Sequence, residues 1–105
     1  MTTRPEGVVA AFQGMATVAT AESFQDEVNK LAGSKAKLVI LELSALQFMS
    51  SFAIGSFLKL ASDVQMKGGQ LRIAAPSEYI SSLLQATRVD QKLKVYPSVE
   101  SAIAG

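Results

Sequence analysis

The chain has 105 residues, of which 49% are apolar and 18% are charged, and its formal net charge is +1. This length suits one compact domain, and so small a charge gives no general attraction to nucleic acid or anionic lipid. Because the sequence contains no cysteine and no histidine, it excludes disulfides, thiolate and imidazole metal sites, cysteine nucleophiles and histidine-based catalytic triads.

The first third of the chain predicts a strand followed by a helix. Residues Gly7–Gln13 are mostly apolar and predict a strand that ends at Gly14. Thr20 then suits the N-cap of an amphipathic helix, which Gly33-Ser34 ends. The apolar side of this helix repeats at the helical spacing i, i+4 and i+7 and consists of Phe24, Val28 and Leu31.

The middle of the chain predicts a buried strand and a long helix. Residues Lys37–Leu43 are almost continuously apolar, which is typical of a central strand covered on both faces. Ser44–Met49 is expected to connect that strand to a helix over about Ser51–Met66. The sequence Lys67-Gly68-Gly69 then supplies a glycine stop at the end of the helix.

The last third of the chain predicts two further strands, each followed by a helix. Leu71–Ala75 is the first of these strands, and Ser77 is expected to cap the helix after it. Leu93–Tyr96 is a short last strand, and Pro97-Ser98 opens a terminal helix. The residues that these two helices are expected to bury are Ile80, Leu83, Leu84, Val99 and Ile103.

Strands that alternate with helices imply a mainly parallel sheet with crossover connections. We therefore predict a single α/β domain over residues 1–105, with residues 1–6 as a flexible N-terminal segment. The sheet should have four or five strands, accompanied by about four helices. Fold class alone does not give a function.

The predicted middle helix has one apolar stripe when its residues are placed at about 100° intervals. The stripe comprises Ala53, Ile54, Phe57, Leu58, Leu60, Ala61 and Val64. Over the whole chain, the residues expected to be largely buried are Val39, Leu41, Ile54, Phe57, Leu58, Ala61, Ile73 and Leu84. Leu58→Ala is therefore expected to cost about 2–5 kcal/mol.

Phe52 falls at the centre of the polar side of this helix, where Ser56 and Lys59 also fall. An aromatic side chain on the exposed side of a helix is typical of a contact residue at a partner interface. The alternative is that the preceding loop turns Phe52 inward onto Leu46 or Met49. The sequence leaves both open.

Ser50 and Ser51 stand where the connector meets the start of the middle helix. A serine at this position caps the free backbone N–H groups of the first turn, but a cap needs only one serine. A second exposed hydroxyl at a helix N-terminus suits a phosphate, because the free amides and the helix dipole both favour an anion there.

The stretch Leu41–Gly55 (LELSALQFMSSFAIG) resembles the signature of STAS (anti-sigma-factor-antagonist) domains. In that family a buried strand ending in Asp/Glu-Leu-Ser leads to a Phe/Met-Asp-Ser-Ser/Thr-Gly-Leu-Gly turn and helix. The resemblance continues along nearly the whole chain, at Gly14, Thr20-Ala21-Glu22, Lys67-Gly68-Gly69, Leu71-Arg72-Ile73, Pro76-Ser77 and Ala86-Thr87-Arg88-Val89.

The resemblance implies regulation by partner switching. Members of the family bind an anti-sigma factor that is itself a serine kinase, and phosphorylation of the signature serine breaks the complex. Ser51 matches that phosphoacceptor by position, and Ser50 is the alternative. The partner-binding residues implied are Ser50, Ser51, Phe52, Ser56 and Lys59.

The chain also departs from the family pattern. Ser50 and Thr17 stand where the family usually has Asp, Phe52 where it has a second Ser or Thr, and Ala53 where it has Gly. The missing acid at position 50 removes a charge beside the acceptor. The pair Ser51-Phe52 is nevertheless similar to the small single-domain scaffold proteins of the stressosome, in which the serine remains a phosphoacceptor. We further expect the chain to lack the extra N-terminal strand of the longer antagonists.

Three functions follow as hypotheses. The first is a signal-transduction protein of transcription regulation that partners an anti-sigma serine kinase or another STAS or scaffold protein. Such a protein needs no enzymatic activity and no cofactor, and it could form a homo-oligomer. The second is a STAS interaction subunit without a phosphoswitch, for example of a transporter or stressosome assembly.

The third hypothesis is a small enzyme or nucleotide-binding domain, and the sequence disfavours it. No glycine-rich phosphate loop follows a strand, since Gly68-Gly69 follows a helix. Glu42 is the one carboxylate expected within a buried strand. It is better explained as an alternate-face or strand-end carboxylate that accepts a hydrogen bond from backbone N–H than as a catalytic acid.

The chain is expected to be a cytoplasmic protein that neither inserts into a membrane nor binds nucleic acid. No apolar run approaches the roughly 20 residues that a spanning helix needs, and the first residues do not resemble a secretory signal. Basic residues cluster only at Lys35/Lys37 and Lys92/Lys94, a spacing typical of a solvated face.

Overall fold

A five-stranded sheet forms the centre of the computed structural model, which describes residues 2–4, 7–16, 20–33 and 36–105. The strands, in their order across the sheet, are β1 (Thr2–Arg4), β2 (Gly7–Ala16), β3 (Leu38–Met49), β4 (Gln70–Ala74) and β5 (Lys94–Tyr96). Strands β2 to β5 are parallel, and β1 pairs antiparallel with β2. The helices are α1 (Ala21–Ala32), α2 (Ser51–Met66), α3 (Glu78–Ala86) and α4 (Val99–Ala104), with a 3-10 turn η2 (Val89–Gln91). The predicted α/β fold with a mainly parallel sheet is confirmed.

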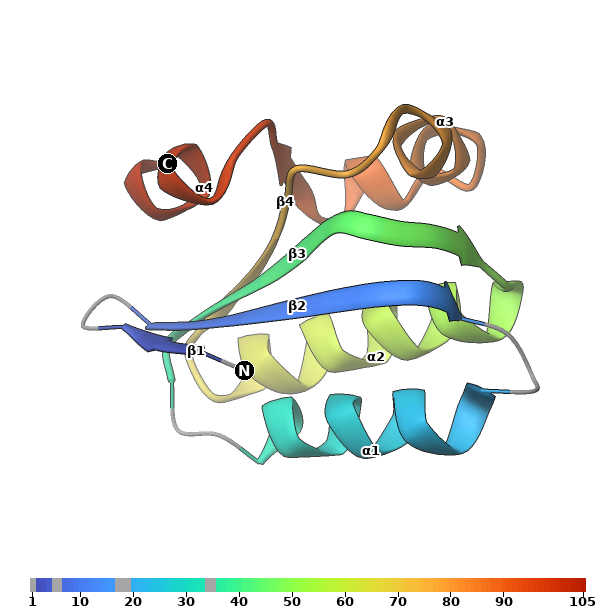
Figure 1. Cartoon of the computed structure of the whole chain (residues 1–105). Helices are drawn as coiled ribbons and strands as arrows, with labels where there is room; N and C mark the ends of the chain where they lie inside the picture. The colour runs from blue at the N-terminus through green and yellow to red at the C-terminus, as the bar shows by residue number, and fades with distance from the viewer. Residues whose placement is uncertain (1, 5–6, 17–19, 34–35) are drawn as a thin grey trace.

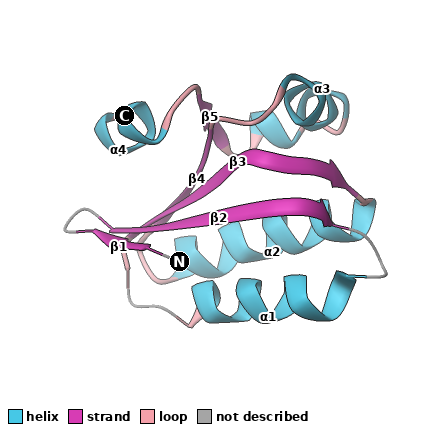
Figure 2. Cartoon of the chain, in the orientation of Figure 1, coloured by secondary structure: helices cyan, strands magenta, loops and turns pink. Residues whose placement is uncertain are grey.

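Two layers of helices cover the sheet. Helices α1 and α2 lie side by side on one face, and α3 and α4 lie on the other (Figure 1). Figure 2 shows that the β3 ribbon passes between these layers. This position explains the apolar character of β3: Val39 and Leu41 belong to the larger core, and Ile40 packs with Ala74 and Ala102 beneath α4.

Three phenylalanine rings hold the larger core together. Phe57 of α2 is fully buried, and its ring centroid lies 5.4 Å from that of Phe12 in β2 and 5.2 Å from that of Phe24 in α1. The rings of Phe12 and Phe24 are 5.5 Å apart, and all three distances suit favourable aromatic pairing. The cluster therefore fixes both helices against the sheet.

Strands β2 and β3 are longer at their carboxyl ends than the sequence predicted. The proposed connector Ser44–Met49 is wrong, because these residues continue β3 and pair with β2 as far as Met49. The expected end of the first strand at Gly14 is also wrong. Gly14 has φ +77° and stands at a shift of register, so it accommodates a bulge that lets the strand continue.

The boundaries of α2 agree with the prediction, but its buried stripe is narrower. Leu58 and Ala61 were expected to be largely buried, and this is wrong, since both are only partly buried. α1 packs along one flank of α2, whereas the flank of Ala61 faces a groove beside β4 and β5. Three residues of the last two helices that were expected to be buried are likewise only partly buried: Leu83, Val99 and Ile103.

The N-terminal region differs from expectation. The strand Thr2–Arg4 pairs with β2, so the expectation that no extra strand precedes Gly7 is wrong. Several other expectations lie outside the described residues. They concern residues 1, 5 and 6 of the N-terminal segment, Thr17, Ser34 and Lys35.

We predict that Phe57→Ala lowers the free energy of unfolding by about 3–5 kcal/mol, because it removes both ring contacts and leaves a cavity. Leu58→Ala is the matched control, since it removes a neighbouring but partly exposed side chain, and it should cost markedly less. Urea unfolding followed by circular dichroism measures both values. Equal losses would show that Phe57 does not anchor the core.

Candidate functional site

The β3–α2 junction places two serines in different roles. Ser50 has extended backbone (φ −79°, ψ 167°), and its Oγ accepts a hydrogen bond from the backbone N–H of Ala53 at 3.3 Å. Ser50 is thus the N-cap of α2, and its hydroxyl is engaged with the helix.

Ser51 is the first helical residue and is exposed. Among the residues that the structure describes, its hydroxyl has no hydrogen-bond partner. The first turn of α2 carries no acidic side chain, so no fixed negative charge of that turn opposes an anion at this position. Of the two serines, Ser51 is the one whose hydroxyl is available for modification.

Phe52 is 44% exposed, which favours the partner-contact interpretation over packing onto Leu46 or Met49. It lines a groove between α1 and α2 together with Ser51, Ser56 and Lys59. Four of the five predicted partner-binding residues therefore share one surface, which we call the α1–α2 groove, and Ser50 stands at its end. Within it, the Ser56 hydroxyl donates to Gln25 Oε1 at 3.3 Å and so joins the two helices.

Gly55 also lines this groove, and the sequence analysis did not single it out as a site residue. A Cβ placed on Gly55 would meet no atom within 4 Å, so packing inside the chain does not require glycine here. Glycine within a helix costs roughly 0.5–1 kcal/mol relative to alanine. Because Gly55 has no side chain, the backbone of α2 is accessible to a ligand in the α1–α2 groove at this position.

A second exposed group lies at the carboxyl end of β2 and β3, and the sequence analysis missed it. Met15 is 53% exposed and pairs across the strands with Phe48, whose ring stacks on that of Tyr79 at 6.4 Å and 22°. Tyr79, in the first turn of α3, is 52% exposed. We call this group the Met15–Phe48–Tyr79 patch. Only the unpredicted extension of both strands brings its members together.

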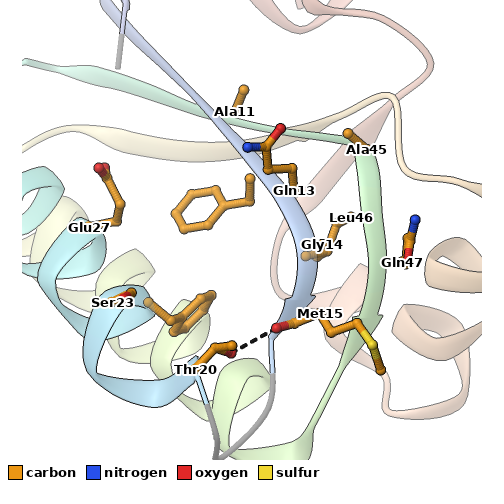
Figure 3. Close-up of a pocket in the computed structure, with 12 residues that line it drawn as sticks. Ala11, Gln13, Gly14, Met15, Thr20, Ser23, Glu27, Ala45, Leu46 and Gln47 are labelled. Atoms are coloured by element: carbon orange, nitrogen blue, oxygen red, sulfur yellow. Dashed lines mark hydrogen bonds between the residues drawn. The ribbon is translucent and has the colours of Figure 1, made fainter.

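The pocket in Figure 3 lies between the ends of β2 and β3 and the start of α1. The Thr20 hydroxyl donates to the carbonyl oxygen of Met15 at 2.7 Å, which joins the start of α1 to β2. Glu27 is the charged residue of the lining, and none of the described lining residues is Lys or Arg. The pocket thus offers no countercharge of its own for the phosphates of a nucleotide.

The other groups with chemical potential have structural roles. Glu42 accepts a hydrogen bond from the backbone N–H of Ser44 at 2.7 Å, as expected for a structural carboxylate, but it lies within β3 and not at its end. In the described ranges, no three His, Cys, Asp or Glu side chains gather as a metal site would need. No helix there has the length and apolar character to cross a membrane.

In a comparison with known protein families, residues 1–102 of the chain match the family model of the STAS domain. A curated relative, the TM1081 homologue of Thermotoga neapolitana, is named as a candidate anti-sigma factor antagonist and is 26% identical over 65 residues. That match covers 62% of this chain and spans 58% of the length of the relative.

Solved structures share the fold over nearly the whole chain. An anti-sigma factor antagonist from Mycobacterium paratuberculosis has a TM-score of 0.83 at 17% identity, covering 98% of this chain and 97% of its own. The anti-sigma factor antagonist SpoIIAA in its unphosphorylated form has a TM-score of 0.73 at 17% identity, covering 93% and 86%. The STAS domain of a SulP transporter from Vibrio cholerae has a TM-score of 0.72 at 22% identity, covering 97% and 81%.

We predict that Ser50→Ala and Ser51→Ala differ in their effect on stability. Ser50→Ala should lower the free energy of unfolding by about 1 kcal/mol, because it removes the cap of α2. Ser51→Ala should change it by less than about 0.5 kcal/mol, as exposed substitutions do. Urea unfolding of both variants beside the original protein measures the difference. A larger loss for Ser51→Ala would contradict the assignment of the cap.

Proposed function

The chain belongs to the STAS domain family, and on that premise we propose that it is a partner-switching regulator of the anti-sigma-factor-antagonist kind. Its partner is a protein, either an anti-sigma serine kinase or another STAS or scaffold protein of the cytoplasm. Phosphorylation of Ser51 controls the complex. The protein acts by binding, and the kinase that modifies it is a separate protein.

The single observation that carries this proposal is the exposed hydroxyl of Ser51, which has no hydrogen-bond partner among the described residues and lies beside the exposed ring of Phe52. A partner that covers Phe52 must also cover Ser51, because the two residues are neighbours on the first turn of α2. A phosphate adds about −1.5 to −2 charges, and burying that charge in an apolar contact is unfavourable. Phosphorylation would therefore separate the partners.

The names of the relatives support the same interpretation. Two of the three structures described above are named as anti-sigma factor antagonists, and one of these is described in its unphosphorylated form. Ser51 also matches the phosphoacceptor of the family signature by position. These similarities supply the partner class and the modification as proposals for this chain.

We assign the Met15–Phe48–Tyr79 patch to the same partner interface. The patch and the start of α2 both lie at the carboxyl end of the parallel strands, where β3 joins them directly. Exposed aromatic and methionine side chains are enriched in the centres of protein interfaces. Phe52 on one side of this end and Tyr79 on the other would then be the anchors.

The switch predicts opposite results for two substitutions of Ser51. Ser51→Asp should weaken binding of the anti-sigma kinase from the same organism by at least about tenfold, or about 1.4 kcal/mol, because it imitates the added charge. Ser51→Ala should retain binding and abolish incorporation of labelled phosphate from ATP. Titration calorimetry measures the affinities, and thermal melts verify that both variants stay folded.

Ser50→Asp is the control, because it places the same charge one residue away at the cap. It should weaken binding less than Ser51→Asp. Equal affinities for the original protein and Ser51→Asp would refute the proposed switch, although they would still be compatible with the proposed binding surface. Phosphate on Ser50 rather than Ser51 would refute the assignment of the acceptor.

The second candidate function is a STAS interaction subunit without a phosphoswitch, as in a transporter or stressosome assembly. The observation that favours it is that Ser50, where the family usually has an acid, is a neutral cap in this chain. The similarity in fold to a SulP transporter domain agrees with it. Failure of the kinase to modify Ser51, with binding intact, would favour this function.

The proposed interface also predicts an effect of Tyr79. Tyr79→Ala should weaken partner binding by about tenfold, because it removes an exposed aromatic anchor. Met66→Ala is the matched control, since Met66 is 83% exposed but lies at the opposite end of α2. It should leave the affinity unchanged. Equal effects of the two substitutions in the same calorimetric titration would exclude the Met15–Phe48–Tyr79 patch from the interface.

A further inference from the structure

A second surface, remote from Ser51, has the features of a binding site that the proposed function does not use. It is a groove beside β4 and β5 on the flank of α2 that α1 does not cover. Its apolar residues are Ala61, Leu71 and Leu93. Ala61 belongs to the apolar stripe of α2, but this flank leaves it partly exposed. We call this surface the β5-edge groove.

The charges along the β5-edge groove are all positive. Lys92 and Lys94 line it and are exposed, and no Asp or Glu is among its lining residues. The one ion pair found within the described residues joins Lys30 and Glu27, on α1. Lys92 and Lys94 therefore lack a carboxylate partner in the described part of the chain.

Arg72, the third basic residue of the lining, is already satisfied inside the protein. Its guanidinium donates to the carbonyl oxygen of Ala102 at 2.6 Å and to Gln70 Oε1 at 2.9 Å, and it lies 5.6 Å from the centre of the Tyr96 ring. The two lysines are thus the charges that remain for a ligand.

The outer edge of β5 offers backbone groups next to these lysines. β5 is the last strand of the described sheet, and it pairs with β4 on one side only. The carbonyl of Tyr96 accepts a hydrogen bond from the N–H of Ala75, so Tyr96 turns its backbone groups inward. Because backbone groups alternate along a strand, those of Val95 point to the open edge.

We propose that the β5-edge groove binds an acidic, extended segment of a partner protein, which pairs with the edge of β5. Its carboxylates would meet Lys92 and Lys94, and an apolar side chain between them would lie over Leu93, next to the start of β5. Edge strands accept such segments through main-chain hydrogen bonds, and the side chains select them. Asp90 lies beside Val95 in a separate pocket, so the positive charge is confined to the β5-edge groove, where charge complementarity favours an acidic occupant.

A second copy of this chain fits the β5-edge groove poorly. Two β5 edges paired about a two-fold axis at Leu93 would place Lys92 of one copy opposite Lys94 of the other, and an axis at Val95 would make the two Lys94 side chains diagonal neighbours. Like charges that face each other across paired strands are destabilising. The groove also lies on the far half of α2, with Ala61 about 15 Å along the helix from Ser51 at 1.5 Å per residue. The segment could therefore bind while a partner occupies the Ser51 end.

The test uses the full-length, ¹⁵N-labelled protein and a synthetic peptide of alternating glutamate and valine, titrated and followed by amide chemical shifts. We expect shifts confined to residues 70–74 and 92–96, with saturation at millimolar peptide. The double variant Lys92→Glu/Lys94→Glu should weaken binding by at least about tenfold, and higher salt should weaken it as well. Lys30→Glu, a matched charge reversal on α1, should not change the affinity.

Each other outcome overturns the proposal. These outcomes are no shifts at millimolar peptide, shifts that map to α1 or the start of α2, equal binding of a lysine–valine peptide, and an affinity insensitive to the double variant. Line broadening that grows with protein concentration and needs no peptide would assign the groove to a second copy of the chain. None of these measurements involves Ser51, so they are independent of the proposed switch.

Discussion

The contact of Phe57 with Phe12 and Phe24 is the constraint on which the arrangement of the candidate site depends. It fixes the rotation of α2 about its axis and so decides which side of the helix faces the sheet. Because the helix is rigid, the same rotation applies to its first turn. Phe52 stands five residues earlier, which places it about 140° away around the helix. The same packing that buries Phe57 therefore turns Phe52 and the adjacent Ser51 toward solvent.

The two serines at the start of α2 have different roles because only one of them is needed to cap the helix. The helix needs a side-chain acceptor for its first N–H groups, and Ser50 supplies it from extended backbone. Ser51 is then relieved of that role and keeps a free, exposed hydroxyl within the described structure. In this chain a neutral serine caps the helix where the family signature has an acid. The local charge beside Ser51 is therefore less negative than in the family pattern.

The surfaces proposed for binding arise where the layers of the fold are incomplete. At the carboxyl end of the sheet, the extensions of β2 and β3 pair Met15 with Phe48, whose ring stacks on Tyr79, and the side chains of Met15 and Tyr79 are exposed. Beside β5, no described helix fills the flank of α2, and Ala61 with Leu93 forms an apolar floor next to two lysines. The two places lie on different parts of the domain, which is the geometry that an adaptor between two proteins needs.

The sequence by itself determined the α/β class, the limits of α2 and the paired serines, because these follow from local periodicity and capping. It placed Phe52 on the polar side of the helix but left open whether its ring is exposed, which the structure decided. It did not determine where β2 and β3 end. Glycine is typical both of turns and of bulges within strands, and only the pairing of β2 with β3 shows that Gly14 stands at a bulge. Nor did it determine the partial burial of Leu58 and Ala61. The helical repeat identifies the apolar side of α2, but it does not show how much of that side other elements cover. Tertiary structure alone decided the Met15–Phe48–Tyr79 patch and the β5-edge groove, whose residues are distant in sequence and meet only through strand pairing and helix packing.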